Sequence, residues 1–570
     1  MNGALLLLGV CVLFYLAYRF CGGLVERMLG IEISRRTPAH TLEDGMDYVP
    51  TRPIVVFGNH FASIAGAGPI VGPILAVQFG WVPVALWIVL GCILIGSLHD
   101  MTALFLSIRH QGRSIGTVIE TLMGYWGRML FLFFCWFTLI LVTAEFTRIV
   151  AETFVEMPAV ATASQLFIVL AIIFGCLVYK GGLPLLPASL IFVPLTFACV
   201  YVGDLFPIDM TKLMKGDADA AKRVWMCMLL AYGFATSALP VWLLLLPRGY
   251  LNSYLLYAMM ALGIVGIFVA MPVIHLDAFT GWNVPNVLSG ESDPLIPLLF
   301  VIVACGACSG FHALVASGTT AKQVDNERSL RLISYGGMLV EGVLAIIALI
   351  SVGIFSQAEY AAALKVQGPI KLFASGMVGF TDKLGLPNTA CMVFVALALA
   401  AFLMTTVDTA TRLARFTWQE IFLPRTRPGQ EHPAEAARSP VGAFVANRYV
   451  ATVIALSAVG WLLLGGGAKS IWPVFASSNQ LLAALTLLGC CLWLLRNRRP
   501  LFIALIPMLF MMLTSGSAII TLFLRNLRLW MDGGFRAGGV MTLTTGVLIG
   551  MSAALVVMGA VSIQKAAKGR

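Results

Sequence analysis

The sequence predicts an all-α integral membrane protein, a polytopic helical bundle of about fifteen spans. Hydrophobic residues make up 59% of the 570 residues, charged residues make up only 11%, and the mean hydropathy is +0.91. Soluble domains of this size do not have such a composition. The apolar runs are also long and continuous, whereas membrane β-strands would give short alternating segments.

Hydropathy, with breaks at Pro, Gly and charged residues, defines the individual spans. We expect them at 3–21, 54–78, 82–108, 128–151, 163–180, 184–203, 224–246, 251–273, 295–318, 333–356, 389–412, 445–464, 472–495, 501–524 and 540–562. They divide the chain into an N-terminal span (1–22), a cytoplasmic loop (23–53), a helical core (54–495) and a two-span extension (496–570). The two halves of the core begin at residues 54 and 295.

The net charge of +10 indicates orientation rather than nucleic-acid binding, because the basic residues lie in short loops between spans. With fifteen spans, the basic clusters fall on one face, at 27–52, 109–128, 322–331, 415–448, 496–499 and 565–570. The positive-inside rule makes that face cytoplasmic. The N-terminus and the acidic loop 277–293 are then outside, and the C-terminus is cytoplasmic.

Three further segments complete the outline. The external loop 357–388 is expected to be partly ordered, and the polar stretch 424–440 is a predicted cytoplasmic linker. The apolar N-terminus has no basic leader, so we expect a retained span rather than a cleaved signal. The twelve Cys lie almost wholly in apolar runs, which is typical of small hydrophobic residues rather than of disulfides.

The second span is the first of two that we expect to be broken. Gly and Pro weaken a helix interior, and this run contains six of them at Gly58, Gly66, Gly68, Pro69, Gly72 and Pro73. Backbone groups freed at membrane depth need partners in protein, water or a bound solute. Asn59, His60 and Ser63 beside the break therefore indicate a solute or ion site. The alternative is a tight helix crossing, in which small residues let two backbones approach.

The span at 295–318 has the same character. Its small and polar residues include Gly306, Ser309, Gly310, His312, Ser317 and Thr319. Interrupted helices in corresponding positions of two halves indicate a transporter binding site. His60 and His312 would then be equivalent positions of the two halves. Free N–H groups of half-helices beginning near Gly66–Gly68 or Gly310 would favour an anionic solute such as a carboxylate.

The two broken spans run in opposite directions across the membrane, as an inverted repeat requires. A second pair of similar features, one in each half, supports the repeat. Glu145 and Arg148 lie at i,i+3 in the first half, and Asp408 and Arg412 lie at i,i+4 in the second. Spans 224–273 would be insertions into this arrangement.

Ionisable residues inside spans are costly and therefore suggest function. For Asp408 two roles stay open: a coupling-ion or proton site whose charge Arg412 balances, or a buried pair with Arg412 that locks two helices. Glu341 has no local cation and is expected to partner Arg412 or a gate. Glu145 with Arg148 is expected to behave similarly nearer the membrane interface.

Asp100 follows His99 at the cytoplasmic end of its span. With Arg109 and Arg113 downstream, it is expected to be a helix-end lock or an inner gate, or else to contact substrate. His60 and His312 are candidates for proton relay or carboxylate binding, or else they are packing residues that donate to backbone carbonyls. Neither has a His or Glu partner at i,i+4, so no metal site is expected.

Asn479 and Gln480 lie inside a late span, and their amides either line the pathway or join helices by hydrogen bonds. No phosphate loop, Walker motif or Ser-His-Asp order is present in the sequence. Transport energy would therefore come from an ion gradient.

These motifs resemble the carbon starvation protein A (CstA) family. The resemblance covers about residues 52–495 and rests on four motifs: Gly58-Asn-His-Phe-Ala-Ser-Ile-Ala-Gly-Ala-Gly-Pro69, Gly310-Phe-His-Ala-Leu-Val-Ala-Ser-Gly-Thr-Thr320 with Lys322-Gln323, Asp408-Thr-Ala-Thr-Arg412, and Trp472-Pro-Val-Phe475 with Asn479-Gln-Leu-Leu482. Asn59 stands where the family often has His. The resemblance implies a bacterial inner-membrane transporter of the amino acid–polyamine–organocation superfamily. Its members are linked to peptide uptake during carbon starvation and to proton-coupled pyruvate uptake.

Together these observations predict a LeuT-like inverted-repeat secondary transporter, with residues 54–495 as its core. It would import a small carboxylate nutrient, pyruvate or a short peptide, with H+ or Na+ and without any other cofactor. The expected partners are the solute and the lipid bilayer, and no nucleic acid. The alternative is an intramembrane sensor that binds a metabolite without moving it, and a membrane enzyme using His60 and His312 is a more distant one.

Overall fold

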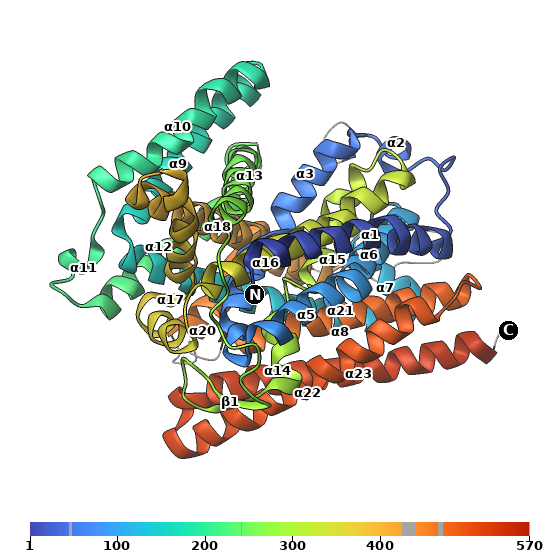
Figure 1. Cartoon of the computed structure of the whole chain (residues 1–570). Helices are drawn as coiled ribbons and strands as arrows, with labels where there is room; N and C mark the ends of the chain where they lie inside the picture. Colours follow the sequence, from blue (N-terminus) through green and yellow to red (C-terminus); the bar gives the residue numbers. More distant parts are fainter. Residues whose placement is uncertain (45–47, 241, 425–439, 465–470, 569–570) are drawn as a thin grey trace.

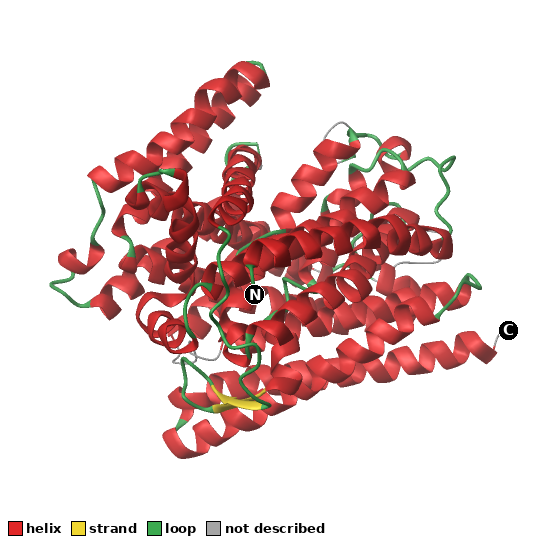
Figure 2. Cartoon of the chain, in the orientation of Figure 1, coloured by secondary structure: helices red, strands yellow, loops and turns green. Residues whose placement is uncertain are grey.

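The chain is described from a computed structural model that covers residues 1–44, 48–240, 242–424, 440–464 and 471–568. Within these residues the regular secondary structure is helical apart from one short hairpin, and loops join the helices (Figure 2). Within the described residues, eleven helices are long and apolar enough to cross a membrane, and one bent pair would be a twelfth. The predicted all-α membrane fold is confirmed.

The described residues of the first half of the chain form thirteen α-helices (Figure 1). They are α1 (Gly3–Leu29), α2 (Pro38–Thr41), α3 (Pro53–Ile64), α4 (Gly68–Ala76), α5 (Trp81–Gly91), α6 (Ser97–Arg109), α7 (Ile115–Met123), α8 (Tyr125–Glu156), α9 (Pro158–Gly175), α10 (Leu185–Leu205), α11 (Met210–Leu213), α12 (Ala218–Ala238) and α13 (Leu245–Ala270). A π-helical turn, Cys92–Gly96, joins α5 to α6 in one continuous span.

The described residues of the second half begin with two antiparallel strands and continue with ten α-helices. They are β1 (Asn283–Pro285), β2 (Ser292–Pro294), α14 (Leu295–Ile302), α15 (Phe311–Gly318), α16 (Gly337–Gly353), α17 (Gln357–Thr381), α18 (Asn388–Ile421), α19 (Pro440–Val445), α20 (Arg448–Leu464), α21 (Ile471–Arg496), α22 (Phe502–Gly533) and α23 (Val540–Lys568). The loop expected to be partly ordered, 357–388, holds α17, which kinks at Gly368 where φ is +66°.

The predicted number of fifteen spans is not reached by length and hydropathy alone. It would require α12, the interrupted pair α14–α15 and the 17-residue α20 to cross as well, and none of these is among the eleven long apolar helices. Fifteen therefore stays a prediction. Most of the linker at 424–440 lies outside the described residues.

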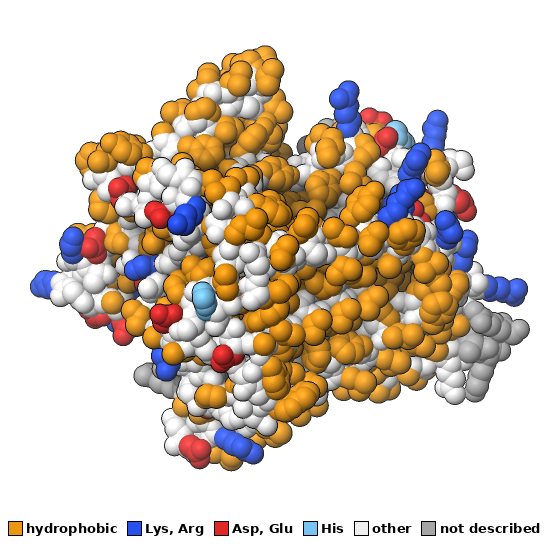
Figure 3. Space-filling model, viewed as in Figure 1, with side chains coloured by type: hydrophobic (Ala, Val, Ile, Leu, Met, Phe, Trp, Pro, Cys, Tyr) orange, Lys and Arg blue, Asp and Glu red, His pale blue; other side chains and the backbone are white. Residues whose placement is uncertain are grey.

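The core of the bundle is built on two long helices, α8 and α18, which pack against each other. Helix α21 packs on α8 and is almost wholly buried, and α22 and α23 cover its other side (Figure 1). Burial of α21 explains why its polar residues can join other helices instead of meeting lipid. On the face shown in Figure 3, hydrophobic side chains cover the middle, Lys and Arg gather at the right-hand end, and side chains of both charges lie at the left-hand end. That separation is typical of a protein with an apolar belt inside a bilayer.

Candidate functional site

Both spans predicted to be broken are interrupted. Helix α3 ends at Ile64 and α4 begins at Gly68 after a bend of 47°. Helix α14 ends at Ile302 and α15 begins at Phe311. The interruptions therefore comprise residues 65–67 and 303–310.

The two interruptions lie against each other. A Cβ added to Gly68 would be 2.6 Å from the Cβ and Sγ atoms of Cys305, and one added to Gly72 would be 2.8 Å from the Ile302 carbonyl oxygen. A Cβ on Gly306 would be 3.6 Å from the Pro69 Cα. Small residues thus permit close backbone approach at the place where the helices stop, as the alternative of a tight helix crossing requires.

The first interruption also contacts α18. A Cβ on Gly66 would lie 2.9 Å from the Thr406 hydroxyl. On α3, the Ser63 hydroxyl donates to the Asn59 carbonyl at 2.7 Å, and Asn59 itself is exposed. Gly58 faces the Tyr257 hydroxyl of α13. The polar residues beside this break therefore separate into a more exposed side, with Asn59, and a buried side, with His60.

The second interruption is held by Asn479 of α21. Its carbonyl oxygen accepts from the Gly310 N–H at 3.0 Å, and its side-chain oxygen accepts from the Phe311 N–H at 2.8 Å. Its amide also donates to the Ser309 hydroxyl at 3.0 Å. The prediction of free N–H groups at Gly310 is wrong, because a span about 170 residues later supplies their acceptors. Of the two roles left open for Asn479, joining helices is the one observed.

The remaining predicted residues of α15 lie at its C-terminal end. The Ser317 hydroxyl donates to the Ala313 carbonyl at 2.7 Å and accepts from the Ile115 N–H at 3.2 Å. Thr319 donates to the Val315 carbonyl and is exposed. These two hydroxyls therefore lie well away from the interruption.

Five ionisable side chains gather behind the two interruptions, and each is at most 2% exposed. This histidine–carboxylate cluster consists of His60 on α3, His99 and Asp100 on α6, His312 on α15 and Glu341 on α16. It draws on both broken spans and on two helices packed against them, so it connects the two halves of the core.

His312 is the centre of the cluster. Its Nδ1 atom lies 2.8 Å from one Asp100 oxygen, and its Nε2 atom lies 3.4 Å from a Glu341 oxygen. The other Asp100 oxygen lies 2.9 Å from His99 Nδ1. His60 bonds Thr320 at 2.9 Å through Nδ1 and is close enough to Asp100 and His312 to interact electrostatically.

Neither of these acids has the arginine partner that the sequence suggested. Asp100 does not lock a helix end with Arg109 and Arg113, since Arg109 pairs with Glu327 at 3.0 Å. Glu341 does not pair with Arg412, since its charged neighbour is His312.

Asp408 is likewise not paired with Arg412. Arg248 of α13 forms the ion pair with Asp408, and Tyr232 of α12 donates to the same carboxylate oxygen at 2.9 Å. Arg412 instead donates to the carbonyls of Thr236 and Leu239 at 2.7 and 3.1 Å. Arg248 was missed because hydropathy placed it between two spans, whereas α13 begins at Leu245 and buries it.

The pairing predicted for Glu145 and Arg148 is present at 2.6 Å. It extends to Glu152, also 2.6 Å from Arg148, and through Glu152 to Lys222 of α12. This network lies on the α8 face toward α12. Among the described residues, no group of three or more His, Cys, Asp or Glu could hold a metal ion.

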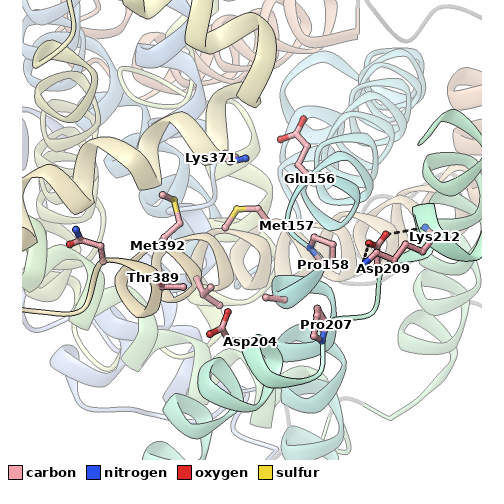
Figure 4. A pocket seen from close by; sticks show the side chains of 13 residues that line it. Glu156, Met157, Pro158, Asp204, Pro207, Asp209, Lys212, Lys371, Thr389 and Met392 are labelled. Atoms are coloured by element: carbon pink, nitrogen blue, oxygen red, sulfur yellow. Dashed lines mark hydrogen bonds and ion pairs between the residues drawn. The ribbon is translucent and has the colours of Figure 1, made fainter. Parts of the chain in front are cut away.

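A pocket of about 530 Å³ lies where α8 ends and α18 begins (Figure 4). Glu156 of α8 and Lys371 of α17 face each other there, close enough to interact electrostatically. Neither side chain forms a hydrogen bond or ion pair in the part of the chain that the structure describes. The opposite charges stay available to a ligand that carries both signs.

A second pocket, of about 360 Å³, lies at the opposite end of α18. Arg412, Arg415 and Arg448 line it together with the end of α12. Three guanidinium groups favour an anion at this end of the bundle.

Comparison with known proteins identifies the family. The profile described as "Carbon starvation protein CstA" matches residues 2–366 and 361–518. The chain belongs to the carbon starvation protein CstA family. The resemblance noted from the motifs is thereby confirmed.

Several CstA-family proteins are about 30% identical to this chain. A protein of Escherichia coli strain K12 named "Peptide transporter CstA" is 32% identical, over 89% of this chain and 79% of its own length. The protein of the same name from Bacillus subtilis strain 168 is 32% identical, over 91% and 90%. The "Pyruvate/proton symporter BtsT" of Escherichia coli strain K12 is 30% identical, over 89% and 80%. These relatives are transporters, not enzymes, and the chain is a multi-pass membrane protein of this transport family.

Among solved structures, a manganese transporter of Eremococcus coleocola in complex with an aromatic bis-isothiourea compound matches 92% of this chain and 99% of its own. The identity is 13% and the TM-score is 0.49. A mutant of the same transporter gives a TM-score of 0.44 at the same identity, over 90% of this chain and 94% of that chain.

Proposed function

We propose that this CstA-family chain is a secondary active transporter that imports pyruvate or short peptides across the bacterial inner membrane. The import is coupled to H+ or Na+ and serves carbon starvation. The observation that carries the proposal is the contact between the two interrupted helices, with the histidine–carboxylate cluster behind it. Interrupted helices in corresponding positions of two halves are typical of a transporter binding site.

We also propose a LeuT-like inverted repeat, in which α3–α4 corresponds to α14–α15 and α8 corresponds to α18. Packing supports this assignment. Helix α13 packs on α3 and α18, and α21 packs on α14, α15 and α8. Helix α21, the last helix of the core, thus contacts the broken span of its own half and the long central helix of the other. Helix α13 makes the same two kinds of contact from the first half, although it falls in the segment expected to be an insertion.

For orientation we propose an external N-terminus and a cytoplasmic C-terminus. The pocket with Glu156 and Lys371 is then external, and the arginine-lined pocket is cytoplasmic. This direction suits import of a carboxylate, because the solute meets both charges on entry and guanidinium groups on exit.

Solute counterflow in proteoliposomes tests the proposal. Vesicles loaded with unlabelled pyruvate or alanyl-alanine are expected to take up the matching labelled solute, and protein-free vesicles are not. Saturable binding of the same solutes without exchange would instead favour an intramembrane sensor that does not transport.

A further inference from the structure

Glu341 is the least compensated acid of the buried core. It is fully buried on α16, and within the described residues its charged neighbours are His312 and, with the same sign, Asp100. Neither of its carboxylate oxygens accepts a hydrogen bond from the part of the chain that the structure describes, although Oε2 lies 3.4 Å from His312 Nε2. A lone carboxylate in such surroundings is costly unless it is paired or takes up a proton.

Both carboxylate oxygens of Asp100, by contrast, have a histidine partner. One of its oxygens faces His312 at 2.8 Å and the other faces His99 at 2.9 Å. The short contact to Asp100 assigns the Nδ1 proton of His312 to that bond. It leaves the Nε2 atom of His312 directed at Glu341. The His312 imidazole thus lies between two carboxylates, of which Asp100 has a second histidine partner and Glu341 does not.

His312, Asp100 and Glu341 can together take up one more proton. With His312 charged and both acids ionised, the net charge of the three groups is −1, and protonation of Glu341 brings it to zero. The other ionisable groups that interact with Asp100 or Glu341 are His60, His99 and the thiols of Cys92, Cys305 and Cys308. None of them brings a permanent positive charge.

Asp408, by contrast, does not need a proton to balance its charge. Arg248 pairs with it inside the core, and Tyr232 donates to it as well. Since a guanidinium stays protonated, Asp408 keeps a compensating charge whatever the pH.

We propose that His312 and Glu341 together bind the coupling proton, which Glu341 accepts and His312 shares, whereas Asp408 stays ionised through the transport cycle. His312 is the second residue of α15 and directly follows the interruption that faces Gly68. Movement of α15 on solute binding would therefore change the Nε2–Glu341 separation and the proton affinity with it. The inference rests on the proposed transport function and specifies its coupling site.

The transport test uses the full-length protein in proteoliposomes with labelled pyruvate and alanyl-alanine. For one proton per solute, one unit of pH gradient supports about tenfold accumulation, because one unit is about 1.4 kcal/mol. Glu341→Gln is expected to lose this accumulation while labelled solute still exchanges, at a rate that no longer depends on pH. Asp408→Asn is the control, and any exchange it retains is expected to stay pH-dependent. Wild-type accumulation by Glu341→Gln would overturn the inference. Absence of exchange in the wild type would instead contradict the transport function.

A second measurement does not depend on transport. Infrared difference spectra on acidification are expected to show the C=O stretch of a protonated carboxylic acid in the wild type and in Asp408→Asn. The band should be absent from Glu341→Gln and should titrate at higher pH in His312→Gln, which removes the neighbouring positive charge. Size-exclusion chromatography identifies variants that fail to fold. Glu341→Gln and His312→Gln report on the same proton independently of each other. An unchanged carboxylic-acid band in Glu341→Gln would overturn the proposal.

Discussion

Arg248 of α13 forms an ion pair with Asp408 of α18, and both side chains are only 1% exposed. The Arg248 guanidinium also donates to the Ala401 carbonyl at 3.1 Å, and Tyr232 donates to the Asp408 carboxylate from α12. Three helices are thus joined at one buried charge pair. Removing one member would leave the other charge uncompensated in the core.

Arg248→Met is therefore expected to lower the unfolding free energy by roughly 3–5 kcal/mol, the range for breaking a buried pair. The double variant Arg248→Met/Asp408→Leu is expected to recover most of that loss, because no charge stays unpaired. Thermal unfolding of the purified proteins in detergent measures both. Arg412→Met is the control: its guanidinium bonds two carbonyls, so its effect should be about the same with or without Asp408→Leu. Losses that simply add for Arg248 and Asp408 would contradict the pairing.

The contact between the interruptions can be tested by a substitution and its rescue. Gly68→Ala would place a Cβ 2.6 Å from Cys305, and overpacking of this kind costs about 1–3 kcal/mol. Cys305→Gly in the same chain removes the opposing Cβ and Sγ and should restore stability and transport together. Gly249→Ala, which meets open space, is the matched control. If Cys305→Gly does not restore the stability lost in Gly68→Ala, and Gly249→Ala has no effect, the two helix interruptions are not in contact.

Asn479 and Gln480 provide a second matched pair, because they are neighbours on one helix with different partners. Asn479 holds the N-terminus of α15, whereas Gln480 donates to the Phe300 carbonyl at 2.6 Å. Leu at either position leaves buried partners unsatisfied and should cost about 1–3 kcal/mol. Only Asn479→Leu is expected to raise the solute concentration for half-maximal transport as well. An equal shift for Gln480→Leu would remove the special role of Asn479.

The pocket between α8 and α18 bears on substrate choice. Glu156 and Lys371 can receive the ammonium and carboxylate of a peptide, whereas pyruvate has no ammonium. Glu156→Gln is thus expected to weaken uptake of alanyl-alanine about tenfold, as loss of one charge-assisted hydrogen bond implies, and to leave pyruvate uptake unchanged. Asp209→Asn, at a carboxylate already paired with Lys212, is the control. Equal effects of Glu156→Gln on both solutes would contradict a role in recognising the ammonium group.

The broken spans could be predicted because their cause is local. Gly66, Gly68 and Pro69 in succession weaken a helix wherever it packs. The pairing of Glu145 with Arg148 was equally accessible, since three residues along one helix fix its geometry.

The partners of the other ionisable residues could not be predicted in this way. His312 and Asp100 are 212 positions apart, and Arg248 and Asp408 are 160 positions apart. Only the packing of α15 on α6 and of α13 on α18 brings each pair together. The sequence suggested Arg412 as the ion-pair partner of Asp408 because the two residues lie four positions apart on one helix. The start of α13 at Leu245, which buries Arg248, depends on tertiary contacts that hydropathy does not report.

The most direct test of the central claim is a cryo-electron microscopy structure of the full chain with saturating pyruvate or alanyl-alanine. The account predicts solute density in contact with residues 65–68 and 303–306, between the two interruptions and beside the histidine–carboxylate cluster. Density confined to the pocket at Glu156 and Lys371, with empty, closely packed interruptions under conditions of measured transport, would contradict it.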